Sequence, residues 1–310
     1  MKKQTFKFID LFAGVGGVRI PFEELGGECV FTSEWDKFAK QTYQENHEGA
    51  VHGDITQINE KDIPEHNLIL AGFPCQAFSN AGKRGGFEDT RGTLFFDVLR
   101  IAREHKPKAL LLENVRGLLS HDEGNTFKVI VSSLEEIGYK VFHKVLYARD
   151  YGVPQNRPRI YLACFRKDII GDREFIFPDK SGIKTKLGDI LEKNVPEKYT
   201  ISDKLWAYLQ NRKQEQKEKG NGFGFTLFNK NSVYVNTMSA RYYKDGSEIL
   251  IEQKGKNPRR LTPREAARLQ GFPDSFKIPV SDTQFYKQMG NSVSVPVIRA
   301  VAKEIVKYIK

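Results

Sequence analysis

The stretch Phe6–Gly17 reads FKFIDLFAGVGG. Its first half, Phe6–Phe12, is a short apolar run typical of a buried strand. The glycines that follow predict a turn from strand to helix, where a ligand can approach the backbone closely. A dinucleotide fingerprint would need a third glycine where this chain has Arg19. The stretch therefore indicates a nucleotide-like cofactor without a pyrophosphate.

Further short apolar runs repeat this pattern along the first 165 residues. Segments with apolar residues at helical spacing lie between them, such as Phe127, Ile130, Val131 and Leu134. Such alternation predicts a doubly wound, mostly parallel α/β sheet of the Rossmann-like kind, which binds ligands at the carboxyl ends of its strands. The expected strands after the first are Cys29–Ser33, Leu68–Ala71, Ala109–Glu113, Val141–Tyr147 and Ile160–Phe165.

The alternation stops near residue 166, which predicts a change of domain. Residues 166–260 are glycine-rich, irregular and basic, with 20 Lys and Arg against 13 Asp and Glu, within a chain of net charge +10. This surplus is either a solvated surface or a face that binds phosphates. We expect a catalytic domain at 1–165, a smaller and partly β domain at 166–260, and a helical segment at 261–310 that packs back on the first domain.

Composition excludes several classes of protein. No apolar run approaches the roughly 20 residues of a membrane span, and the start MKKQTFKFIDLF lacks the long apolar region of a secretory signal. We therefore expect a cytoplasmic protein. Its three cysteines are odd in number and far apart, which argues against a disulfide framework and against a zinc site of paired cysteines.

Three sequence features near the glycine turn favour a nucleoside cofactor. Glu34 lies 20 residues after Gly14, at the end of the second expected strand, where an acidic side chain can accept hydrogen bonds from ribose hydroxyls. Trp35 offers a flat face for adenine, and Asp54-Ile55 follows as a contact for the adenine edge. Each feature alone also fits core packing, a helix start or a turn. Together they indicate S-adenosylmethionine (AdoMet).

Reactive side chains gather at the same predicted edge of the sheet. Cys75 lies in GFPCQAFS, directly after the strand-like run Leu68–Ala71 and before a glycine-rich stretch. A lone cysteine is usually inert, but this position favours a functional thiol. Glu113 ends the next strand, where an unpaired carboxylate would be costly, and Arg157 and Arg159 precede the last strand. We expect the thiol, the carboxylate and an arginine to converge.

Six blocks in this order resemble the conserved blocks of the bacterial DNA (cytosine-5) methyltransferases of restriction-modification type: FAGVGG, GFPCQ, ENV, QNRPR, REAARLQGFP and GNSV. The resemblance implies an AdoMet-binding catalytic domain and a target-recognition domain at 166–260 that reads double-stranded DNA. It also implies that Cys75 is the nucleophile, that Glu113 is the acid at the base, and that Arg157 and Arg159 are partners of Glu113.

The resemblance also assigns residues to the cofactor and to DNA. Those around AdoMet are Phe12, Gly14, Gly16, Gly17, Glu34, Trp35, Asp54, Ile55, Pro74, Leu94, Asn291, Ser292 and Val293. The DNA contacts that we expect, some of them by position only, are Ser79, Lys83, Arg84, Arg91, Asn221, Thr237, Arg241 and Tyr242.

The implied reaction moves a methyl group to C5 of a cytosine flipped out of duplex DNA, through a bond between Cys75 and C6. A tRNA cytosine-5 methyltransferase is the rival interpretation, since a related branch shares the thiol and ENV blocks. A nicotinamide oxidoreductase is opposed by Arg19. We expect a monomer of bacterial or phage origin, and a restriction endonuclease acting on the same site is a candidate companion.

Overall fold

The computed structural model describes residues 6–74, 94–222 and 224–310. Contacts between Cα atoms divide the chain into two compact units. Unit 1 consists of Met1–Leu146, Pro158–Asp179 and Val297–Lys310, and unit 2 of Tyr147–Arg157 and Lys180–Pro296. No helix in these described parts is long and apolar enough to cross a membrane. The division into catalytic, DNA-reading and C-terminal parts stays a prediction about function.

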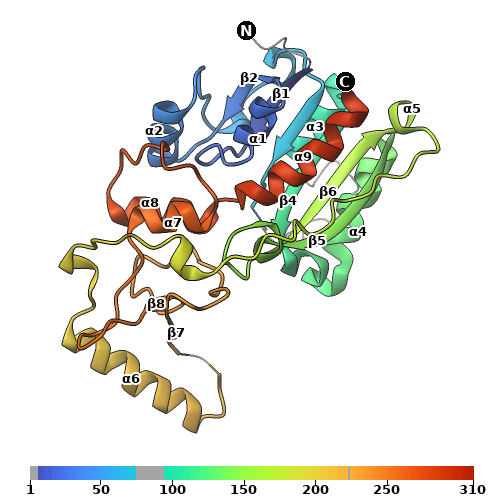
Figure 1. Ribbon diagram of the computed structural model, residues 1–310. Helices are drawn as coiled ribbons and strands as arrows, with labels where there is room; N and C mark the ends of the chain where they lie inside the picture. Colours follow the sequence, from blue (N-terminus) through green and yellow to red (C-terminus); the bar gives the residue numbers. More distant parts are fainter. Residues whose placement is uncertain (1–5, 75–93, 223) are drawn as a thin grey trace. The chain divides into compact units, whose positions relative to one another are not determined.

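The sheet of unit 1 has six strands in the order β2-β1-β3-β4-β6-β5 (Figure 1). Strands β2, β1, β3 and β4 are parallel to one another, and β6 runs antiparallel to β4. The strands are β1 (Phe6–Leu11), β2 (Gly27–Ser33), β3 (Leu68–Ala71), β4 (Ala109–Val115), β5 (Tyr139–Tyr147) and β6 (Pro158–Arg166).

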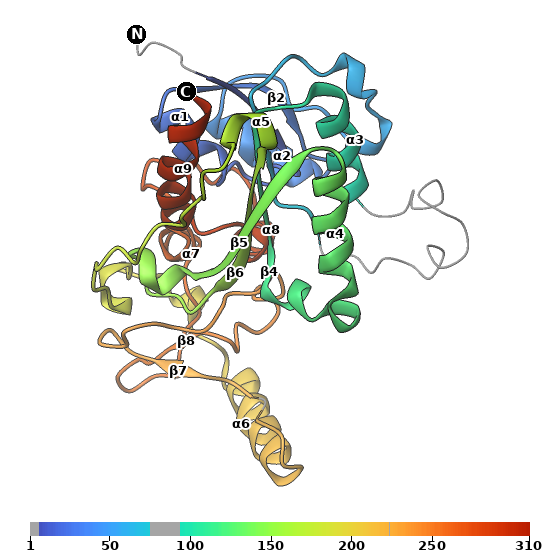
Figure 2. The same cartoon turned by 90° about the vertical axis from the view of Figure 1, so that its right-hand side faces the viewer.

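Helices cover both faces of this sheet (Figure 2). Helices α3 and α4 contribute buried residues to a core that includes Ile9, Ile69 and Leu110 from the central strands. Helices α1 and α9 lie on the other face, where Arg299 of α9 pairs with Glu24 of α1 at 2.7 Å. The helices with residues in this unit are α1 (Arg19–Glu24), α2 (Lys37–Asn46), α3 (Phe95–His105), α4 (Asn125–Glu136), α5 (Lys167–Ile170) and α9 (Val295–Ile309).

Every apolar run that the sequence marks as a strand in the first 165 residues forms one. The doubly wound, mostly parallel α/β fold class is thereby confirmed. The central strands are apolar throughout because both of their faces are buried, as all four residues of β3 illustrate. The antiparallel direction of β6 was not predicted, since the apolar pattern of a buried strand is the same in either direction.

Unit 2 has little regular structure. Its strands β7 (Leu227–Phe228) and β8 (Leu250–Ile251) have two residues each, and its helices are α6 (Asp203–Glu218), α7 (Pro263–Leu269) and α8 (Asp282–Asn291). A small core joins α6 to β8 through buried Leu209 and Leu250, with Trp206 packed edge-on against Phe225.

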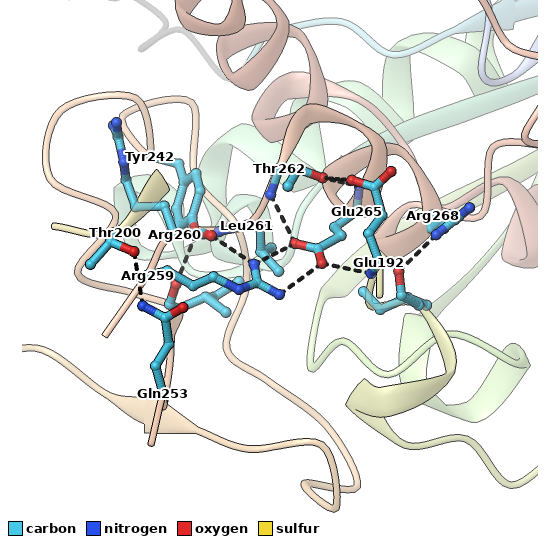
Figure 3. A network of polar contacts seen from close by, with 12 residues as sticks. Glu192, Thr200, Tyr242, Gln253, Arg259, Arg260, Leu261, Thr262, Glu265 and Arg268 are labelled. Atoms are coloured by element: carbon cyan, nitrogen blue, oxygen red, sulfur yellow. Dashed lines mark hydrogen bonds and ion pairs between the residues drawn. The ribbon is translucent and has the colours of Figure 1, made fainter. Parts of the chain in front are cut away.

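A buried ion pair organises the start of α7 in unit 2 (Figure 3). Glu265 accepts two hydrogen bonds from the guanidinium of Arg259, at 2.7 and 2.8 Å. It also accepts one from the backbone of Thr262, while the Thr262 hydroxyl accepts one from the backbone of Glu265, so the two residues form a capping box. Its Oε1 accepts a further bond from the backbone N–H of Glu192. One carboxylate thus joins three segments of the unit.

Replacing Glu265 with glutamine is expected to destabilise the protein by about 3 to 5 kcal/mol, because it leaves the buried charge of Arg259 without compensation. Urea denaturation measures this change in the free energy of unfolding. The matched control is Glu197→Gln, which breaks an exposed ion pair with Lys256 and is expected to leave the unfolding curve unchanged. Equal effects of the two variants would contradict the role given to Glu265.

Candidate active site

The glycine turn after β1 has an unusual backbone. Phe12, Gly14 and Gly16 all have positive φ, at 55°, 57° and 83°. For a non-glycine residue such as Phe12 this conformation costs on the order of 1 to 3 kcal/mol, and such residues cluster at ligand sites. The turn is tied to the end of β2 by a hydrogen bond from the Ala13 N–H to the Ser33 carbonyl. The strained turn is therefore held in place by its neighbours.

His47 packs against the glycine turn. Its Nε2 lies 3.3 Å from the carbonyl oxygen of Val15, and its ring packs against Tyr43 with centroids 4.6 Å apart. A Cβ atom added to Gly16 would lie 2.1 Å from this Nε2. Only glycine fits at this position, both for its backbone angle and for the space that His47 leaves.

Replacing Gly16 with alanine is expected to destabilise unit 1 by about 2 to 4 kcal/mol, from overpacking together with the positive φ. We also expect a loss of AdoMet affinity, measured by titration calorimetry, because the turn would have to move. The double variant Gly16→Ala/His47→Ala should recover only the part of the lost stability that is due to the clash with His47. Gly53→Ala is the matched control, since among the described residues other than its chain neighbours no atom lies within 4 Å of its added Cβ, and it should fold as stably as the unchanged protein.

The expected cofactor side chains lie around this turn in unit 1. The buried carboxylate of Glu34 accepts hydrogen bonds from the backbone N–H groups of Gly14 and Asp36, both at 2.8 Å. Burial raises the pKa of Glu34, although these two hydrogen bonds oppose the shift. Trp35 is 79% exposed, so its ring face is open to a ligand. Asp54 caps the helical turn Ile55–Gln57.

Glu113 and Arg159 form an ion pair at the carboxyl end of β4. Arg159 Nε lies 3.1 Å from Glu113 Oε1, and the side chains are 14% and 12% exposed. The antiparallel register places them together, because Glu113 pairs with Tyr161 and Val115 pairs with Arg159. The structure thus brings together the expected carboxylate and one of the two expected arginines.

The segment after β3 lies beside this ion pair. A Cβ added to Gly72 would be 3.6 Å from Glu113 Oε2. The buried amide of Asn114 donates to the carbonyl of Phe73 at 2.9 Å and fixes the chain at that point. Cys75 follows two residues later and lies outside the described residues. The same holds for the expected DNA contacts Ser79, Lys83, Arg84 and Arg91.

Arg157 lies in the interior of unit 2. It is 2% exposed, and its guanidinium donates to the carbonyl oxygens of Met238, Gly290 and Ser292 at 3.0, 2.9 and 2.5 Å. These contacts give Arg157 a positioning role for the GNSV turn, whereas the ion pair with Glu113 is formed by Arg159. An added Cβ on Gly290 would lie 2.3 Å from the backbone of Ser239, so the turn also packs closely there.

The remaining expected residues are placed as follows. Of the GNSV residues in unit 2, Asn291 is exposed, Ser292 is partly buried and Val293 is buried. Of those in unit 1, Pro74 is exposed and Leu94 is the N-cap of α3.

The expected DNA contacts in unit 2 differ in accessibility. Arg241 and Asn221 are exposed, and the Thr237 hydroxyl donates to the Asn156 carbonyl at 2.6 Å. The prediction that Tyr242 contacts DNA was wrong. Its side chain is fully buried, its hydroxyl donates to the Ile249 carbonyl and accepts from the backbone of Leu261, and no part of it can reach a ligand.

Comparison with known proteins decides the family. The profile described as C-5 cytosine-specific DNA methylase matches residues 6–307. The chain belongs to this family. It is a DNA cytosine-5 methyltransferase, and the resemblance seen in its sequence blocks is confirmed.

Curated relatives of this methyltransferase cover nearly the whole chain. It is 61% identical to the Type II methyltransferase M.NlaX of Neisseria lactamica, over 97% of this chain and 96% of the relative. It is 59% identical to the Type II methyltransferase M.SsoII of Shigella sonnei, over 97% of this chain and 80% of the relative. Such names support the restriction-modification type.

Solved structures agree on the fold of the methyltransferase. A DNMT2 mutant from Spodoptera frugiperda superimposes with a TM-score of 0.78 at 23% identity, over 97% of this chain and all of that one. The S. pombe Dnmt2 methyltransferase gives a TM-score of 0.77 at 21% identity, over 98% of this chain and 99% of that one. At these identities the likeness concerns the fold alone.

Sequence reasoning missed several supporting residues of the methyltransferase. Asn114 and His47 each hold backbone carbonyls next to the site. Asp10 is buried in β1 behind the glycine turn, where burial raises its pKa to about 8 and Tyr43 donates to it at 3.3 Å. An acidic or amide side chain inside an apolar strand was the available signal for Asp10 and Asn114. His47 offered none, because its contact with Val15 depends on the fold.

Proposed function

We propose that this enzyme transfers a methyl group from AdoMet to C5 of a cytosine flipped out of double-stranded DNA, within a specific short sequence. In this proposal Cys75 forms a temporary covalent bond to C6 of the base. The observation that carries the proposal is the Glu113–Arg159 ion pair beside the segment that leads to Cys75.

The chemistry explains why a thiol and a carboxyl group are needed together. C5 of cytosine is a poor nucleophile in an aromatic ring, so a soft thiolate must first add to C6. Addition of the Cys75 sulfur places electron density on C5 and negative charge on the ring. Glu113, hydrogen-bonded through a proton to N3, neutralises that charge, and Arg159 braces the carboxyl group at the 3.1 Å distance seen here.

Glu113 must carry a proton while the base is bound, because only a protonated carboxyl group can donate a hydrogen bond to N3. After methyl transfer the C5 proton leaves to water, and the electron pair of the C5–H bond expels the Cys75 thiolate. The Cys75 nucleophile is thereby regenerated.

The residues around the glycine turn fit AdoMet. When bound, AdoMet supplies an electrophilic methyl group on its sulfonium sulfur. Glu34 is suited to the ribose hydroxyls, because each carboxylate oxygen that accepts a backbone N–H retains a second lone pair. The open face of Trp35 is suited to adenine, and Asp54 with Ile55 to the edge of that base. We also assign Phe12, Gly14, Gly16, Gly17, Pro74, Leu94, Asn291, Ser292 and Val293 to this site.

Base flipping is required by geometry, since C6 of a stacked cytosine cannot be reached from a pocket. We propose that residues 78–92, with Ser79, Lys83, Arg84 and Arg91, contact the DNA around the flipped base. In unit 2 we retain Asn221, Thr237 and Arg241 as candidate contacts.

The deciding experiment is bisulfite sequencing of DNA from cells that express the chain. The proposal predicts that one cytosine in one short sequence context is protected from bisulfite conversion. The experiment reports the activity, the modified base and the sequence specificity together. Transfer of label from AdoMet to purified duplex DNA, compared with tRNA, tests the rival substrate. Labelling of tRNA in preference to DNA would overturn the proposal.

We further propose that the enzyme acts in the cytoplasm as a monomer, which suffices to modify a short site one strand at a time. Sedimentation with and without duplex DNA tests its oligomeric state. A restriction endonuclease of the same specificity remains the proposed companion in the cell, without a stable complex.

A further inference from the structure

Unit 2 carries a stacked arginine that the proposed chemistry does not use. Arg149 lies in the helical turn Ala148–Tyr151, with its guanidinium carbon 5.1 Å from the ring centroid of Tyr147 and 4.7 Å from that of Tyr234. Among residues 6–74, 94–222 and 224–310, no carboxylate lies within 4.0 Å of this guanidinium. The neighbouring Asp150 pairs with Lys180 instead. The charge of Arg149 is therefore available to a partner.

The stack is firmly built. The backbone of Val235, next to Tyr234, exchanges hydrogen bonds with Pro154 and Asn156 at 2.9 and 2.8 Å. The turn that holds Arg149 is tied to the same loop, because the Ala148 N–H donates to the Arg157 carbonyl at 3.1 Å. Through these hydrogen bonds of their neighbours, Arg149 and Tyr234 are both held next to the segment that contains QNRPR.

The surface around the stack is open. Tyr234 is 43% exposed and its neighbour Val233 is 67% exposed, although both are large apolar or aromatic side chains. The rings of Tyr147 and Tyr234 both lie near the guanidinium carbon of Arg149 and restrict the positions that it can take. A guanidinium donates hydrogen bonds through the N–H groups in its plane. These groups match a pair of oxygen acceptors in one plane.

We propose that Arg149, held by Tyr147 and Tyr234, binds a phosphate of duplex DNA. The inference rests on the proposed function, which supplies duplex DNA as the partner. A phosphate is favoured over a base edge because phosphates take most protein–DNA hydrogen bonds. Because no carboxylate in the described part of the chain pairs with Arg149, its charge also suits an anion, in a unit whose sequence is rich in Lys and Arg.

The test is duplex DNA binding by the full chain as a function of salt. Arg149→Gln is expected to weaken binding about 10-fold near 0.1 M salt, equally for the methylated sequence and a scrambled one, and to reduce the salt slope by about 1. Arg149→Lys should keep the slope while losing part of the affinity, because it retains charge without the planar fork.

Tyr234 provides a matched pair of variants. Tyr234→Ala should weaken binding roughly threefold, as expected for a lost cation–π contact, whereas Tyr234→Phe keeps the ring and should bind as the unchanged protein. Equal weakening by both would overturn the stacking role. Thermal unfolding of each variant separates loss of the contact from loss of folding.

Failure of this inference can be distinguished from failure of the proposed function. If the unchanged protein transfers no methyl group to duplex DNA, the proposed function fails, and this inference fails with it. If the unchanged protein is active but Arg149→Gln keeps full affinity and slope, this inference alone is overturned. A loss confined to the methylated sequence would also overturn it, since that result is the mark of base reading.

Discussion

Replacing Cys75 with serine is expected to abolish methyl transfer, with a loss on the order of 10⁴-fold or more, as found when a covalent nucleophile is removed. A serine hydroxyl ionises far less readily than a thiol and is a harder nucleophile, so it cannot add to C6 at a useful rate. Incorporation of label from AdoMet into duplex DNA measures the change. DNA binding should persist, because the side chain removed is small and only the reaction depends on it.

Cys29→Ser is the matched control for this variant. Burial raises the pKa of the Cys29 thiol to about 11, so this thiol stays protonated at neutral pH and should contribute nothing to turnover. A duplex with a fluorinated target pyrimidine should trap the unchanged protein and Cys29→Ser covalently, but not Cys75→Ser. Trapping of Cys75→Ser, or equal inactivity of both variants, would remove Cys75 as the nucleophile.

Replacing Glu113 with glutamine is expected to lower kcat by about 10² to 10⁴-fold, the usual contribution of a positioned acid. The amide keeps the shape of the side chain but cannot share its proton with N3 in the same way. Because Glu113 acts on the cytosine, AdoMet affinity should stay close to that of the unchanged protein. Single-turnover methylation with preformed complexes isolates this step from binding.

Arg159 tests whether the observed ion pair acts as a unit. Arg159→Gln should also lower kcat, and the double variant with Glu113→Gln should lose much less than the product of the two single losses, because the side chains are in contact. Glu136→Gln, at an exposed carboxylate in α4, is the control and should leave kcat unchanged. Fully independent losses would mean that Arg159 does not act through Glu113.

The two arginines of QNRPR make different contacts, so their substitution should have different effects. Arg157 donates to three backbone carbonyls in unit 2, whereas Arg159 pairs with Glu113 in unit 1. Loss of activity on changing Arg157 would accordingly be accompanied by loss of folding stability. Activity and stability measured together therefore separate Arg157, which holds the GNSV turn, from Arg159, which acts through Glu113.

Local patterns in the sequence were enough to predict the fold class, the positions of the six strands and the family. Strand positions were readable because the apolar runs and the punctuating glycines are local features, and β3 has the predicted bounds Leu68–Ala71. The capping box of Thr262 and Glu265 was readable for the same reason, since its two residues are three apart in the chain. Six ordered blocks were enough to indicate the family that the comparisons show.

Contacts between residues far apart in the chain could be seen only in the folded protein. Strand β6 runs antiparallel to β4, and the resulting register brings Glu113 and Arg159 together. Folding also buries Tyr242, which the sequence offered as a DNA contact, and it stacks Arg149 on Tyr234. Burial and the pairing of side chains depend on contacts between residues far apart in the chain, and a local pattern of residue types does not show these contacts.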